Sequence, residues 1–119
     1  MKGKLDHVVP LSELAKAQMT PNNHRWILTA TGERGLTNFS EEKSKLDKAT
    51  GVSGWRIHDL RRSSRSLLSR TGVAPDIAER VLAHKIGGVA GIYDRYADLE
   101  EKRDALAKLA ALVETIINE

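Results

Sequence analysis

The second half of this 119-residue chain carries short apolar stripes at helical spacing, each closed by glycine or proline. One stripe runs from Ile57 to Leu68 and is followed by Gly72. Pro75 then stands where the first turn of a helix accepts a residue without an N–H. A last stripe of leucine, valine and isoleucine occupies residues 99–117. This pattern predicts a mainly α-helical domain in which the stripes cover one another.

The first half of the chain gives weaker signals. Residues 1–10 are expected to form a strand or the remnant of a short β-hairpin, which a proline ends. Ser12 is expected to cap a short helix that stops before Pro21, and another helix is expected to open at Ser40 and close at Gly51. We treat residues 1–119 as one partial domain.

Composition excludes several classes of site. The chain has no cysteine, so disulfides and thiolate metal sites are excluded. No apolar run approaches the ~20 residues of a membrane span, so no membrane partner is expected. The net charge is +3, and residues 55–70 hold a single acid, Asp59, among five arginines: Arg56, Arg61, Arg62, Arg65 and Arg70. Such a cluster suits phosphate binding, although a solvated helix face would have the same composition.

Two histidines and a tyrosine stand out beside this cluster. His58 and Arg61 are three residues apart and share a helix face, which Arg65 extends by one turn. A histidine next to an arginine offers donors and fixed positive charge to a phosphate. His84 ends the helix predicted from residue 75, and Tyr93 follows nine residues later. Taken singly, each has an ordinary explanation: chance spacing, an interaction with the helix end, or packing.

In combination, these residues resemble a known family. The stretch HDLRRS…LLSRTGVAPDIAERVLAHK…GGVAGIYDRY is similar to the tyrosine recombinases, especially the phage and genomic-island integrases. That family has an H-x-x-R motif, then a helix ending in leucine–glycine–histidine, then the nucleophilic tyrosine nine residues after that histidine. His58 and Arg61 match the first motif, His84 matches the second histidine, and Tyr93 falls at the nucleophile. The resemblance covers residues 55–115.

The N-terminus extends the resemblance. KGKLDHVVPLS is similar to the second half of the family's β-hairpin, which carries a catalytic lysine. Lys2 stands at that position, with Lys4 as the other candidate. Ala83 replaces the glycine that usually precedes the histidine. No residue can match the family's first catalytic arginine, which lies upstream of the hairpin, so we expect this chain to be a fragment that is inactive alone.

The resemblance implies transesterification in site-specific DNA recombination, with neither a metal nor another cofactor. Tyr93 would attack the scissile phosphate and form a 3′-phosphotyrosyl link, with His58 accepting its proton. Arg61 and His84 would stabilise the transition state, and Lys2 would protonate the leaving 5′-oxygen. The contacts to flanking phosphates would come from three further arginines: Arg56, Arg62 and Arg65.

The implied partners are double-stranded DNA and other recombinase protomers, in the cytoplasm of a bacterium. A second hypothesis takes the same stretch as a helix-turn-helix, with Gly72 in the turn and residues 75–84 as the recognition helix of a non-enzymatic DNA-binding regulator. A third is a helical fragment without activity. Formation of a covalent protein–DNA adduct distinguishes the enzyme from both.

Overall fold

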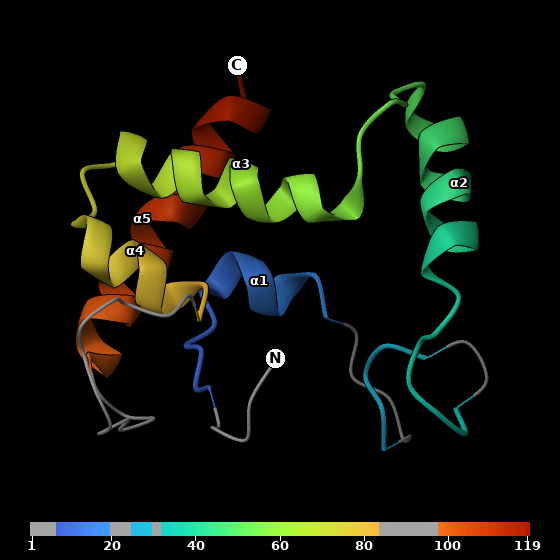
Figure 1. Cartoon of the computed structure of the whole chain (residues 1–119), viewed down its shortest axis with the longest axis horizontal. Coiled ribbons are helices and arrows are strands. Elements are labelled where there is room, and N and C mark those ends of the chain that lie inside the picture. Colours follow the sequence, from blue (N-terminus) through green and yellow to red (C-terminus); the bar gives the residue numbers. More distant parts are fainter. Residues whose placement is uncertain (1–6, 20–24, 30–31, 84–97) are drawn as a thin grey trace.

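A computed structural model of the chain describes residues 7–19, 25–29, 32–83 and 98–119 (Figure 1). Within these ranges the regular structure is helical, which confirms the mainly α prediction, and no strand is present. The helices are α1 (Glu13–Ala17), α2 (Phe39–Thr50), α3 (Ile57–Arg70), α4 (Pro75–Val81) and α5 (Leu99–Ile117). The predicted hairpin remnant is not seen in its described part, residues 7–10, and residues 1–6 lie outside the described ranges.

Local chemistry sets most of the helix ends. The Oγ of Ser12 accepts a hydrogen bond of 3.2 Å from the amide of Ala15, which caps α1 as predicted. Gly51 closes α2 in the left-handed conformation, with φ of 72°. Pro75 is the first residue of α4, also as predicted. The end of α4 was predicted wrongly: the helix stops at Val81, three residues before His84.

The core lies where α3, α4 and α5 pack against one another. Leu68 of α3 and Ala78 of α4 are fully buried, and Ala105 of α5 is 2% exposed. Val81 and Val73 complete this cluster, and α1 lies against α5 at its edge. The apolar stripes therefore cover one another as the sequence predicts, but the side chains involved are small and few.

The region containing α2 stands away from this core (Figure 1). The chain exposes 9343 Å² of surface, against roughly 6,400 Å² for a compact monomer of this mass. Part of the excess is apolar, since Phe39 and Leu46 of α2 and Leu60 of α3 are about half exposed. None of the helices in the described residues is both long and apolar enough to cross a membrane.

Candidate functional site

The C-terminal end of α4 brings together residues that are far apart in the sequence. Arg61 of α3 donates a hydrogen bond from Nη2 to the carbonyl oxygen of Leu82. His7, in the N-terminal arm, donates from Nε2 to the carbonyl oxygen of Arg80 at 2.9 Å. The last carbonyls of a helix lack intrahelical partners and carry partial negative charge, so they attract such donors. Two segments more than fifty residues apart therefore meet at one helix end.

Three of the predicted catalytic residues, His84, Tyr93 and Lys2, lie outside the described residues. The described residues that match the predicted site are therefore His58, Arg61 and the arginines beside them on α3.

Ala83 adopts an uncommon backbone conformation directly before His84. Its φ is 58°, in the left-handed region, where a Cβ atom meets the following carbonyl oxygen. Glycine has no Cβ and adopts this region without strain. The structure thus gives a physical reason for a glycine at this position, and shows that the alanine here costs stability.

We expect Ala83→Gly to stabilise the chain by about 1 kcal/mol, because the relief of strain exceeds the extra flexibility of glycine in the unfolded state. Urea unfolding followed by circular dichroism measures the change. Ala107→Gly is the matched control: Ala107 is exposed in the interior of α5, where glycine should destabilise by a similar amount. Loss of stability in both variants would contradict the assigned backbone strain.

His58 and Arg61 occupy the first and second turns of α3. His58 is exposed, whereas Arg61 is partly buried by its contact with the end of α4. Their spacing leaves both side chains on neighbouring positions of one face, as the sequence predicts. An exposed imidazole and a guanidinium that donates to the end of α4 therefore lie on one face of α3.

Arg65 has a different environment from the other arginines of the cluster. Its Nε donates to Oε1 of Glu79 in α4 at 2.9 Å, and its Nη1 donates to Oγ of Ser69 at 2.6 Å. The ion pair joins α3 to α4 beside the core. Arg65 therefore stabilises the packing of these helices, and a phosphate would have to compete with Glu79 for its guanidinium.

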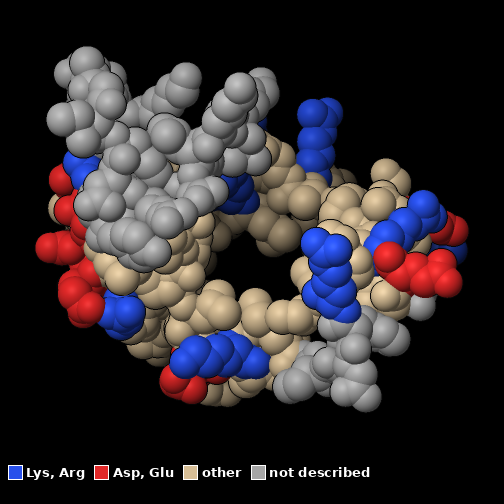
Figure 2. Space-filling view, turned by 90° about the horizontal axis from the view of Figure 1, so that it is seen from below, with Lys and Arg blue, Asp and Glu red and all other residues tan. Residues whose placement is uncertain are grey.

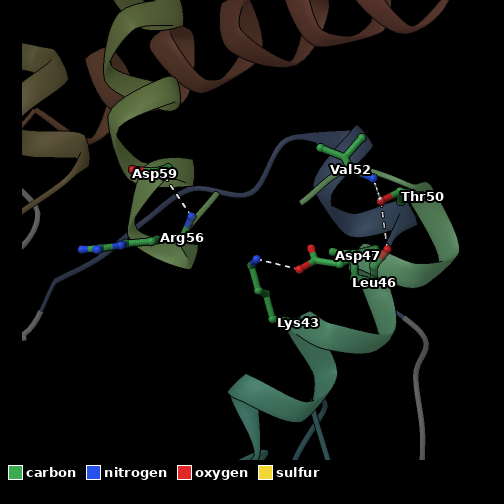
Figure 3. Close-up of polar contacts among 7 residues, drawn as sticks. All are labelled: Lys43, Leu46, Asp47, Thr50, Val52, Arg56 and Asp59. Carbon is green, nitrogen blue, oxygen red and sulfur yellow. Dashed lines mark hydrogen bonds and ion pairs between the residues drawn. The ribbon is translucent and has the colours of Figure 1, made fainter. Parts of the chain in front are cut away.

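Arg56 and Arg62 reach solvent from the start of α3. The Arg56 amide donates to Oδ2 of Asp59 at 2.9 Å, while its side chain extends away from Lys43 and Asp47 of α2 (Figure 3). The Arg62 side chain is 77% exposed, and its Nη1 is 3.7 Å from Oδ1 of Asp59. These two arginines can meet a flanking phosphate without breaking an interhelical contact.

Positive side chains do not merge into one broad patch on the face shown in Figure 2, where the blue groups stand apart and several adjoin acids. Ion pairs along α2 and α5 also mix the two signs of charge, for example Lys43 with Asp47 and Lys108 with Asp104. Long-range attraction of the described part of the chain for a polyanion is therefore expected to be moderate.

The charges on α4 give little support to the helix-turn-helix hypothesis. The single basic residue of α4, Arg80, forms an ion pair with Asp98. Its first turn exposes Asp76, which would face the DNA backbone with the wrong charge. A recognition helix inserted in the major groove needs exposed donors and positive charge along its outer face, and α4 lacks them within its described residues.

Sequence reasoning missed two residues that hold this region together, His7 and Lys102. Lys102 is 3% exposed although it lies in the highly charged run EEKRD. A signal was present, because Lys102 is spaced three residues after Leu99 and four before Leu106, which places it on the apolar stripe of α5. Within the described residues, no group of acids and histidines is arranged to hold a metal ion.

Comparison with known proteins found no matching family model, no matching curated protein and no matching solved structure.

Proposed function

We propose that this chain carries part of the active site of a tyrosine recombinase, which cleaves and rejoins DNA through a 3′-phosphotyrosyl intermediate during integration or excision of a mobile element. The observation that carries the proposal is the contact of Arg61 with the carbonyl of Leu82. It brings the arginine of the H-x-x-R motif to the helix end from which the chain continues to His84 and Tyr93.

In the proposed reaction, the phenol oxygen of Tyr93 attacks phosphorus while the bond from phosphorus to the 5′-oxygen breaks. The Tyr93 proton passes to His58, and Lys2 donates a proton to the leaving 5′-oxygen, so no metal or external reactant is needed. Arg61 and His84 donate hydrogen bonds to the nonbridging oxygens, whose negative charge grows in the transition state. The energy of the phosphodiester is kept in the protein–DNA link and is available for rejoining.

The proposal is tested with a fusion protein, in which the upstream half of a tyrosine-recombinase catalytic domain supplies the first catalytic arginine to this chain. Its substrate is a duplex nicked one or two nucleotides from a candidate cleavage site, so that the short released strand diffuses away and cannot rejoin. A protein–DNA band that survives denaturing electrophoresis supports the enzyme. Binding without such a band, by a folded chain tested over a panel of attachment-site duplexes, supports the DNA-binding regulator instead. No binding at all supports the helical fragment without activity.

DNA affinity should depend on Arg56 and Arg62. We expect the double variant Arg56→Gln, Arg62→Gln to bind duplex DNA more weakly and to flatten the slope of log affinity against log salt by about 2, because each lost phosphate contact changes that slope by about 0.9. Fluorescence anisotropy from 50 to 200 mM salt measures both quantities. The matched control, Arg103→Gln with Lys108→Gln, removes two exposed charges from α5. An equal loss in both double variants would show that only net charge matters.

A further inference from the structure

The α2 helix has an apolar side that the described part of the chain does not cover. None of the extensive helix–helix contacts among the described residues involves α2, and none of its residues is buried (Figure 1). A helix of 12 residues is marginal by itself, because helices in proteins gain most of their stability by packing an apolar face. The exposed apolar side chains on α2 and after it, which we call the α2 surface, are Phe39, Leu46, Val52, Ile57 and Leu60.

Phe39 and Leu46 form the centre of the α2 surface. They are seven residues apart, so they lie two turns apart on one side of the helix, and each is about half exposed. On a neighbouring flank, Lys43 donates to Oδ2 of Asp47 at 2.7 Å, and its Nζ lies 4.5 Å from the centroid of the Trp55 ring (Figure 3 shows the ion pair). The segment that leads to α3 therefore covers this flank and leaves the side with Phe39 and Leu46 open.

The uncovered area of the chain is large enough for a stable interface. The chain exposes roughly 2,900 Å² more surface than a compact monomer of its mass. A standard protein–protein interface removes about 800 Å² from each partner, and homodimers that exist only as dimers bury more and are more apolar. One such interface between two copies would therefore remove much of the excess, and the apolar side chains of the α2 surface suit it.

The charges of α2 are self-complementary. Its first turn carries Glu41 and Glu42, and its last turn carries Lys48. If two α2 helices pair antiparallel about a two-fold axis, each first turn lies beside the last turn of the other copy, and opposite charges meet at both ends. A polyanion would instead meet as many acids as lysines, because α2 has three of each. The charge pattern therefore favours a second copy of this chain as the occupant.

We propose that this chain forms a two-fold symmetric dimer through the α2 surface. The two α2 helices lie antiparallel, Phe39 and Leu46 of each copy pack against the same side chains of the other, and Glu41 of each copy lies beside Lys48 of the other. Such an interface uses the same patch on both copies, so association stops at two chains. The pairing needs neither DNA nor a catalytic residue, so it holds or fails independently of the proposed function.

Sedimentation equilibrium of the 119-residue chain without DNA, from nanomolar to micromolar concentration, tests the pairing. We expect a mass of about twice 13.1 kDa at the upper end. Leu46→Glu places a charge in the interface and should weaken association by at least about 10-fold. Its helical content by circular dichroism should match the parent, because Leu46 is half exposed and lies outside the core. The matched control is Ile117→Glu, which changes an exposed apolar residue at the end of α5 and should leave association unchanged.

Three results of this experiment overturn the proposal. The first is a parent chain that stays monomeric; if Leu46→Glu then lowers the affinity of the monomer for duplex DNA, the α2 surface binds DNA instead. The second is a mass that keeps rising beyond that of a dimer, because a two-fold interface is closed. The third is equal weakening by Leu46→Glu and Ile117→Glu, which means association through any exposed apolar residue.

Charge reversal tests the antiparallel arrangement. Glu41→Lys and Lys48→Glu each place like charges opposite one another at both ends of the paired helices, so each should weaken the dimer by about threefold or more at low salt. The combined variant restores opposite charges and should associate about as tightly as the parent. Residues seven apart do not contact each other within a helix, so the recovery can come only from the second copy. A combined variant that associates more weakly than either single variant overturns the antiparallel pairing.

Discussion

Tyr93→Phe is expected to abolish the covalent protein–DNA adduct, whereas Tyr96→Phe is expected to retain it. Phenylalanine keeps the ring and its packing but lacks the oxygen that attacks phosphorus, so the loss should be complete. The nine-residue interval from His84 selects Tyr93 over Tyr96. Both variants are made in the fusion protein and compared with its parent on a nicked duplex that has sulfur in place of the bridging 5′-oxygen, where the adduct accumulates because the released thiol rejoins poorly.

The two tyrosines control for each other, because they are three residues apart and are replaced by the same side chain. Circular dichroism of both variants should match that of the parent. If the adduct forms in Tyr93→Phe and is lost in Tyr96→Phe, Tyr96 is the nucleophile and our assignment is wrong.

Arg61→Ala should reduce the rate of adduct formation by about 10²–10³-fold at saturating DNA. Removal of one preorganised donor to a developing oxyanion typically has this effect. The variant also removes the hydrogen bond to the Leu82 carbonyl, so the end of α4 loses a cap. The melting temperature of the variant is therefore measured together with the rate of adduct formation, to show how much of the loss in rate comes from loss of folded structure.

Two further variants distinguish the effect of the Arg61 charge on the reaction from its effect on the end of α4. Arg61→Lys keeps a positive charge but not the planar fork that grips two oxygens, and it should recover only part of the rate. Arg62→Ala removes the neighbouring arginine, whose side chain is 77% exposed and whose ion pair with Asp59 lies within α3; it should change the rate less than threefold at saturating DNA. A rate for Arg61→Ala as high as that for Arg62→Ala, in folded proteins, would exclude Arg61 from the reaction.

Three helix boundaries were predictable because single residues determine them locally. Ser12, Pro75 and Gly51 each act through their own backbone or side chain, without help from the rest of the fold. The end of α4 was not predictable in this way. Apolar residues continue past Val81 at helical spacing, but the helix ends there, and Ala83 adopts a left-handed conformation. Alanine rarely adopts this conformation, so the residue type gave no indication of it.

In the candidate site, too, features set by local sequence were predictable and features set by contacts between distant segments were not. Spacing along one helix predicted that His58 and Arg61 share a face, because helical periodicity is a local property. The roles of Arg65, His7 and Lys102 depend on contacts with Glu79, Arg80 and Val8, which come from other segments. An arginine in a basic cluster and a lysine in a charged run give no sign of such partners. Only the three-dimensional arrangement distinguishes Arg65, which ties two helices, from Arg62, which faces solvent.

The most direct test of the central claim is to locate the covalent bond in the trapped complex. Trypsin separates the two tyrosines, because cleavage after Lys85, Arg95 and Lys102 places Tyr93 in peptide 86–95 and Tyr96 in peptide 96–102. A fusion protein, in which the upstream half of a tyrosine-recombinase catalytic domain with its first arginine precedes this chain, is incubated with a nicked duplex that has sulfur in place of the bridging 5′-oxygen. The product is digested with nuclease and trypsin and analysed by mass spectrometry. Our account predicts a nucleotide remnant on peptide 86–95, attached to Tyr93. A folded fusion protein that binds the duplex and forms no adduct, or one that carries the remnant on any other peptide, contradicts it.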